Sequence, residues 1–175
     1  MTLSYADAAA QITAPGERYE THEITVNGVT YTAFKGAPGT LRELFDLTTL
    51  YGDTEYLVYE DERYTFTEVH AHAAGLAAAL VNRYGVRKGD RVAIAMRNYP
   101  EWIMTYVGAL AAGAIVVSMN AWWTAEELDY GLEDSGTTVL VADAERVART
   151  RESAARLGIR TIGVRLGDGD TPEGV

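Results

Sequence analysis

The stretch of sequence that decides the fold is RVAIAMRNYPEWIMTYVGALAAGAIVVSMN, residues 91–120. It begins with an apolar run over residues 91–96 that predicts a buried strand, and it ends with a second such run over residues 115–118. Between the two runs, Pro100 predicts the first turn of a helix, because a proline there loses no hydrogen-bond partner. A helix that is apolar on all sides and leads into an apolar strand is typical of the centre of a parallel sheet. The stretch therefore predicts a strand–helix–strand unit.

Part of the same stretch is long and uncharged enough to resemble a membrane-spanning helix. The 24 residues from Trp102 to Ala125 carry no charge, and a spanning helix needs about 20 apolar residues. However, Gly113 ends the helical pattern, and polar groups such as Ser118 and Asn120 interrupt the apolar run. We therefore expect no membrane span.

Helix starts in the chain are marked by capping-box spacings, in which a hydroxyl or amide side chain is followed three residues later by glutamate. The spacing occurs at Thr40, Thr65, Asn98 and Thr124. Further short strands are expected at residues 56–59 and 63–66, paired as a hairpin around residues 60–62, and at 138–142 and 161–164. This alternation predicts an α/β fold, a mainly parallel sheet with flanking helices, preceded by small β-hairpins.

Residues 1–39 are expected to form an N-terminal extension with its own hairpin. Asn27 and Gly28 lie between two alternating runs, and Asn-Gly is the strongest short signal for a type I′ turn. A two-residue turn pairs Val26 with Val29 and gives the hairpin an apolar face, which should pack against another surface. We assign residues 40–166 to the α/β subdomain and residues 167–175, rich in glycine and aspartate, to a linker.

Composition excludes several function classes. The chain has 15 basic and 25 acidic residues, a net charge of −10, which argues against nucleic-acid binding. It contains no cysteine, so disulfides and thiolate chemistry are excluded, and its three histidines are not spaced as metal ligands. The first residues have neither a basic nor an apolar segment of a signal peptide, so we expect a cytoplasmic protein.

Residue chemistry alone gives no complete active site. Gly108 and Gly113 have the glycine spacing of a phosphate-binding loop, but the required Lys and Ser or Thr are missing, so we expect small residues that let a helix approach a sheet closely. The candidate interface or ligand crevice is Asn120, Trp122 and Trp123, which follow a predicted parallel strand, because crevices lie at the carboxyl ends of such strands. Core or interface packing of the two indoles is the favoured interpretation, and no catalytic or metal-binding residue is assigned.

From Thr40 to Asp143 the sequence resembles the N-terminal part of the adenylate-forming enzymes, specifically AMP-forming acyl-CoA synthetases of the long-chain fatty-acid type. Matching segments are Thr40-Leu-Arg-Glu-Leu-Phe45, Tyr64-Thr-Phe-Thr-Glu-Val69, Gly85-Val-Arg-Lys-Gly-Asp-Arg-Val-Ala-Ile94, Asn98-Tyr-Pro-Glu-Trp102, Leu110-Ala-Ala-Gly-Ala-Ile-Val-Val-Ser-Met-Asn120, Thr124-Ala-Glu-Glu-Leu128 and Leu132-Glu-Asp-Ser-Gly136. Ser118 stands where the family usually has proline.

The resemblance implies a parent ligase that uses ATP, Mg and coenzyme A to convert a carboxylic acid, here a fatty acid, to its acyl-adenylate and then to the thioester. The family's phosphate loop, adenine segment, hinge and catalytic lysine do not match residues of this chain, so we expect a truncated, inactive N-terminal fragment that holds no cofactor by itself. Its expected partners are the remainder of the polypeptide or, through bare apolar faces, other copies. The alternatives are an adenylating module that loads a carrier protein and a self-sufficient α/β binding domain, so whether the chain is itself an enzyme stays open.

Overall fold

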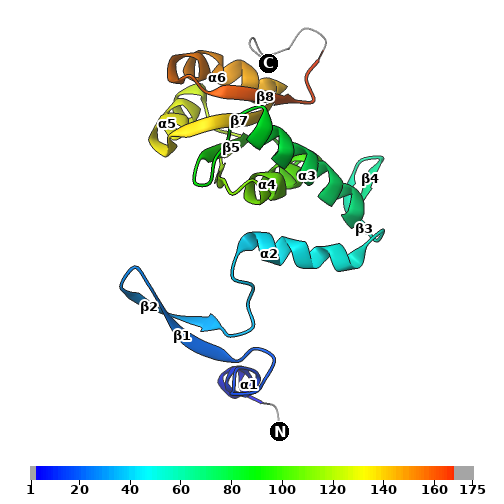
Figure 1. The fold of residues 1–175 in the computed structure, drawn as a ribbon, viewed down its shortest axis with the longest axis vertical. Helices are drawn as coiled ribbons and strands as arrows, with labels where there is room; N and C mark the ends of the chain where they lie inside the picture. The colour runs from blue at the N-terminus through cyan, green and yellow to red at the C-terminus, as the bar shows by residue number, and fades with distance from the viewer. Residues whose placement is uncertain (1–2, 168–175) are drawn as a thin grey trace. The chain divides into compact units, whose positions relative to one another are not determined.

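The computed structural model describes residues 3–167 and divides into two units between Leu44 and Phe45. Its helices are Tyr5–Ile12 (α1), Leu41–Asp46 (α2), Phe66–Asn82 (α3), Pro100–Ala111 (α4), Ala125–Ser135 (α5) and Ala144–Leu157 (α6), with a 3-10 helix, η1, at Leu47–Tyr51. Its strands are Thr21–Val26 (β1), Val29–Phe34 (β2), Glu55–Tyr59 (β3), Glu62–Thr65 (β4), Arg91–Ala95 (β5), Ile115–Ser118 (β6), Thr137–Asp143 (β7) and Arg160–Val164 (β8). Figure 1 labels these elements.

The first unit contains α1 and the predicted hairpin of β1 and β2. Asn27 and Gly28 have φ angles of 49° and 80°, the positive values that a type I′ turn needs. Val26 pairs with Val29 in the predicted register. On the apolar face of the hairpin, Val29 and Tyr31 are 51% and 52% exposed.

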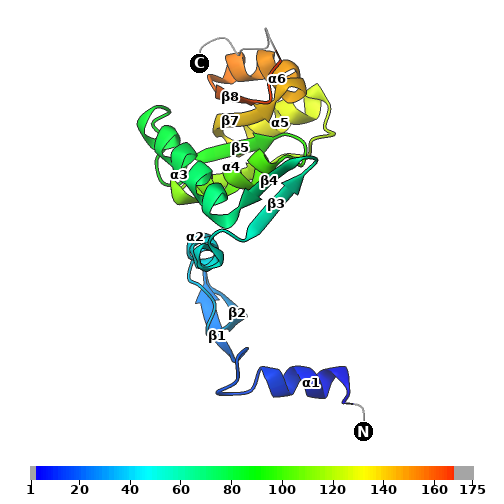
Figure 2. The same ribbon diagram turned by 90° about the vertical axis from the view of Figure 1, so that its right-hand side faces the viewer.

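The second unit is built on a four-stranded parallel sheet in the order β6-β5-β7-β8. Residues 91–120 form β5, α4 and β6, and the chain then crosses through α5 to place β7 on the other side of β5. Helices lie on both sides of the sheet in Figures 1 and 2. The predicted fold class, a parallel α/β sheet with small hairpins before it, is confirmed.

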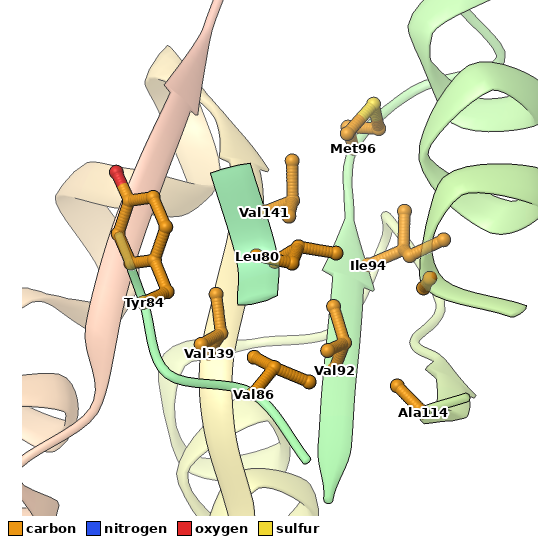
Figure 3. Packing of buried hydrophobic residues seen from close by; sticks show 10 residues of the cluster. Leu80, Tyr84, Val86, Val92, Ile94, Met96, Ala114, Val139 and Val141 are labelled. Carbon is orange, nitrogen blue, oxygen red and sulfur yellow. The ribbon is translucent and has the colours of Figure 1, made fainter. Parts of the chain in front are cut away.

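Alternating strand residues divide the core into two layers. Val92 and Ile94 of β5 pack with Leu80 of α3 on one face of the sheet, in the cluster drawn in Figure 3. Ala93 of β5 packs with Leu128 of α5 on the opposite face. Successive side chains of a strand point to opposite faces, so a strand that is apolar throughout requires helices on both sides, as here.

Gly108 has a different role from the one predicted. A Cβ atom at this position would lie 2.8 Å from the carbonyl oxygen of Ala73 and 3.3 Å from the Leu76 side chain, both on α3. The missing side chain therefore lets α4 approach another helix, and not the sheet. Sequence spacing could not distinguish the two packing partners, because both faces of α4 are apolar.

Three of the four expected helix starts have threonine caps. At Thr65 and Thr124 the hydroxyl accepts the N–H three residues on, and the glutamate side chain returns to the cap N–H. At Thr40 the hydroxyl accepts the Glu43 N–H, but the Glu43 carboxylate accepts the N–H of Gly39 instead. The threonine-to-glutamate spacing that predicts these helix starts therefore corresponds to hydrogen bonds between neighbouring residues.

The expected cap at Asn98 is wrong. Helix α4 begins at Pro100 with Tyr99 as its N-cap, and no side chain caps it. A proline forces the preceding residue into extended backbone, and Tyr99 has φ −86° and ψ 159°. Pro100 therefore makes Tyr99, and not Asn98, the N-cap residue of α4.

The second predicted hairpin forms with a shorter turn. Tyr59 pairs with Glu62, which leaves two turn residues, and Glu60 has a positive φ of 48°. Phe66 begins α3 instead of ending the strand, because Thr65 caps the helix there. Among the described residues, no helix is long and apolar enough to cross a membrane. The predicted linker lies, from residue 168 on, outside the described residues.

Candidate functional site

The candidate residues lie at the carboxyl edge of the parallel sheet. Strands β5 and β7 are neighbours, but α4 after β5 and α6 after β7 cover opposite faces. Loops that leave neighbouring strands toward opposite faces open a crevice between them, where ligands bind in such sheets. Asn120, Trp122 and Trp123 lie in the loop after β6, at this same edge.

Asn120 shapes that loop through its own turn. Its side-chain Oδ1 accepts the N–H of Trp122 at 2.9 Å, and its carbonyl oxygen accepts the N–H of Trp123 at 3.1 Å. Asparagine forms such turns readily because its short side chain reaches the backbone two residues on. Asn120 thus has a structural contact with each of the two tryptophan amides.

The two indoles have different surroundings. Trp123 is half-buried, and its ring would lie 3.0 Å from a Cβ atom at Gly131 of α5. Trp122 is 71% exposed, and the Arg97 guanidinium lies 4.2 Å from the centre of its ring. A cation at this distance from an indole face is attracted by the ring electrons. Of the two tryptophans, Trp122 is therefore the one that a ligand or another protein surface can reach.

The Trp122–Arg97 pair borders a cleft of about 450 Å³. Its lining residues are Tyr59, Arg97, Asn98, Tyr99, Ala121 and Trp122. Three aromatic rings and one guanidinium give a surface suited to a flat or anionic group. The lining contains no carboxylate, histidine, serine or lysine side chain.

A buried ion pair joins the loops at this edge. The side chains of Asp143, the last residue of β7, and Arg146 of α6 are 6% and 1% exposed, and Arg146 Nη1 lies 3.1 Å from Asp143 Oδ2. The same carboxylate oxygen accepts the N–H of Arg97 at 2.9 Å, and Arg146 Nε donates to the carbonyl oxygen of Ala121 at 2.7 Å. Asp143 and Arg146 therefore connect the loops after β5, β6 and β7.

A second charged cluster lies around Arg165, which follows β8 and has a positive φ of 50°. Its guanidinium makes two 2.8 Å hydrogen bonds to the Glu62 carboxylate and one of 3.1 Å to Glu101. The guanidinium also lies 5.0 Å from the ring centre of Tyr59 and 4.9 Å from that of Tyr99. These contacts connect β4 and the first turn of α4 to the end of β8.

The cluster shifts the ionisation of its members. The hydrogen bonds from Arg165 lower the pKa of Glu62, and the hydrogen bonds to Glu62 raise the pKa of Arg165. The hydrogen bond that Tyr64 donates to Glu62 raises the pKa of Tyr64. All three shifts stabilise the charge pattern present at neutral pH, so the cluster acts as a structural ion pair.

The described residues do not fit the ATP–Mg site that the resemblance implies for the parent. No group of three or more His, Cys, Asp or Glu side chains in residues 3–167 could hold a metal ion. The Thr124 hydroxyl, in the loop after β6, is used as a helix cap. No catalytic step can be derived through ATP or Mg from this part of the chain.

Sequence reasoning missed the charged residues of both clusters. Asp143 had a recognisable signal, since it ends an apolar strand and caps the next helix by accepting the Arg146 N–H. Arg165 had none, because its partner Glu62 lies 103 residues earlier. Aromatic contacts between Tyr59 and Tyr99 were likewise invisible along the sequence.

Comparison with known proteins identifies the class. The sequence profile of the AMP-binding enzymes, described as "AMP-binding enzyme", matches residues 46–173. The chain therefore belongs to the AMP-binding enzyme family, and the resemblance found in the sequence is confirmed.

Its relatives are acid–CoA ligases. The chain is 37% identical over 102 residues to a long-chain-fatty-acid–CoA ligase of Salmonella typhimurium, and 38% identical over 103 residues to 4-coumarate–CoA ligase 3 of Oryza sativa. These alignments cover 58% and 59% of this chain but 18% of each relative. The structure matches O-succinylbenzoate coenzyme A synthetase of Bacillus subtilis in complex with AMP, with a TM-score of 0.61 and 28% identity, over 68% of this chain and 30% of that one.

Proposed function

We propose that residues 40–166 are the N-terminal α/β subdomain of an ATP-dependent acid–CoA ligase. The parent enzyme activates a carboxylic acid, a fatty acid by this proposal, as its acyl-adenylate and transfers the acyl group to coenzyme A in the cytoplasm. The observation that carries the proposal is the family match over residues 46–173. A CoA acceptor is favoured over a carrier protein because the relatives compared above are named CoA ligases or synthetases.

In this proposal the described residues are scaffold. The sheet and its two helical layers hold the loop of Asn120, Trp122 and Trp123 at the carboxyl edge. In the parent enzyme, the rest of the polypeptide binds ATP and Mg and contributes the catalytic lysine. The aromatic cleft beside Trp122 supports a role as an interface or a ligand crevice, because it offers aromatic rings and a guanidinium.

Exposed apolar side chains support the remainder of the polypeptide as the natural partner. Leu47, Leu50 and Tyr51 of η1 are 54%, 84% and 60% exposed. Apolar groups that gather on a surface mark interaction sites. A self-sufficient binding domain would cover them, whereas a subdomain leaves them for its neighbours, and the isolated chain should then self-associate.

An adenylation assay tests the proposal. Purified chain 1–175 is incubated with ATP, Mg²⁺ and palmitate, and pyrophosphate release is followed, with a complete fatty-acid–CoA ligase as the positive control. We expect no release above the enzyme-free rate. Sustained release by the pure chain would contradict the proposal that residues 1–175 lack the catalytic machinery.

Light scattering with an apolar-surface dye gives a second, independent measurement. We expect dye binding and a mass that rises with protein concentration. A monodisperse monomer that binds no dye would favour the self-sufficient domain instead.

A further inference from the structure

Two arginines on the first turns of α6 hold the loop that follows β6. Arg146 contacts the carbonyl oxygen of Ala121 through Nε, at 2.7 Å, and through Nη2. Arg149 Nη1 donates to the carbonyl oxygen of Trp123 at 2.8 Å. The two carbonyls lie on either side of Trp122 in the chain, so the backbone is restrained immediately before and after the exposed indole.

Acidic neighbours orient both guanidinium groups. Glu145 accepts a hydrogen bond from Arg146 Nη1 at 2.9 Å on one oxygen and contacts Arg149 Nη2 with the other. Asp143 pairs with Arg146 and also accepts the N–H of Arg97, whose guanidinium lies over the Trp122 ring. Both partners of the Trp122–Arg97 contact are thus anchored to the same buried ion pair.

We propose that Arg146 and Arg149 are positioning residues for Trp122, and that they fix its indole against Arg97 at the border of the aromatic cleft. The inference rests on the crevice of the proposed function. Its test measures only the loop of this chain, so failure of the proposed function and failure of this inference are separate results.

Arginine is suited to this role in a way that lysine is not. The planar guanidinium presents several N–H groups in a fixed geometry, so Arg146 meets a carbonyl on one edge and carboxylates on another. A lysine ammonium carries the same net charge, but it concentrates this charge on one nitrogen atom. It cannot hold the Ala121 carbonyl and the Asp143 carboxylate in the same geometry.

Amide hydrogen exchange tests the outer contact. Arg149→Ala should speed exchange at the Trp122 and Trp123 amides about tenfold, since a hydrogen bond from a charged donor to their loop is lost. Arg151→Ala is the matched control, because this exposed side chain on the same helix makes no hydrogen bond to the loop in the described structure. It should change the same rates less than about twofold.

Fluorine NMR tests the inner contact. The full chain is labelled with 5-fluorotryptophan, which reports on its three tryptophans, and the Trp122 resonance is assigned with Trp122→Phe. Arg146→Lys should shift or broaden that resonance and leave Trp102, which stacks on Tyr106 in the other layer, unchanged.

Two results would overturn the proposal. One is the absence of any change: the loop amides exchange at the wild-type rate in Arg149→Ala, and the Trp122 resonance keeps its wild-type position and width in Arg146→Lys. The other is an equal rise of exchange in the loop and at Val139 and Val141 of β7, since this would show loss of stability of the whole sheet. Arg149 is partly exposed, so the Arg149→Ala result is available even where Arg146→Lys does not fold.

Discussion

Residues 3–44 and residues 45–167 both form regular helices and strands, but only the second region buries side chains. Every buried apolar side chain of the described structure lies between Val69 and Ile159, whereas Val29 and Tyr31 of the first region stay half exposed. Turn and cap signals therefore suffice to form β1, β2 and α1. A core additionally requires a second layer packed on the apolar face of a sheet.

The largest expected effect comes from the core of the second region. Ile94 on β5 is fully buried, so Ile94→Ala should lower the free energy of unfolding by about 2–5 kcal/mol. Val29→Ala in the first region removes a half-exposed side chain and should change it by less than about 0.5 kcal/mol. Urea unfolding followed by tryptophan fluorescence measures both. Equal losses would show that the first region also has a core.

A smaller effect tests the helix contact within the second region. Gly108→Ala places a Cβ atom 2.8 Å from the Ala73 carbonyl oxygen, so we expect a destabilisation of about 1–3 kcal/mol from overpacking. Gly75→Ala is the matched control on α3, because a Cβ atom there meets nothing within 4 Å. It should stabilise the helix by about 0.5–1 kcal/mol. Thermal unfolding compares the two, and the same sign for both would contradict this account.

A third effect belongs to the first region. Gly28 has a φ of 80° in the turn, and Gly28→Ala should cost about 1–2 kcal/mol because a Cβ atom disfavours that backbone. The measurement is the intensity of NMR contacts between Thr25 and Thr30, which face each other across the hairpin. Gly36→Ala, where the backbone has no positive φ and a Cβ atom meets nothing, should preserve them. Loss of the contacts in both variants would contradict the prediction, because it would show that the hairpin does not depend specifically on the positive φ at Gly28.

The smallest effect concerns the β3–β4 hairpin, which an arginine far along the chain anchors. Arg165 lowers the pKa of Glu62, so this carboxylate stabilises the fold at pH values above the ordinary glutamate pKa, and the contribution is lost as the pH falls below it. Between pH 7 and pH 3 the unfolding temperature of the wild type should therefore fall more than that of Arg165→Met. Arg63→Met, on the exposed Arg63–Glu55 pair, is the control and should retain the wild-type slope. Equal pH dependence of the unfolding temperature in the wild type and Arg165→Met would contradict the claim that Arg165 stabilises this hairpin through Glu62.

The two hairpins show how far sequence reasoning reached. Asn27 and Gly28 determined turn type and register for β1 and β2, because the turn is a property of two residues. For β3 and β4 the predicted turn was one residue too long, since Glu62 joins the strand, with Tyr64 and Arg165 as partners of its side chain. Asn98 failed as a cap for a local reason, because Pro100 restricts Tyr99 and moves the helix start.

The sequence by itself determined the class of fold, the order of elements and the position of the Asn120–Trp123 loop after a parallel strand. These follow from periodicity, caps and turns, which act over a few residues. Only the tertiary structure decided that Trp122 faces outward over Arg97, that Gly108 meets α3, and that Asp143, Arg146 and Arg165 link distant loops. Charged pairs and close helix contacts depend on which segments the fold brings together, and no short-range pattern in the chain records that.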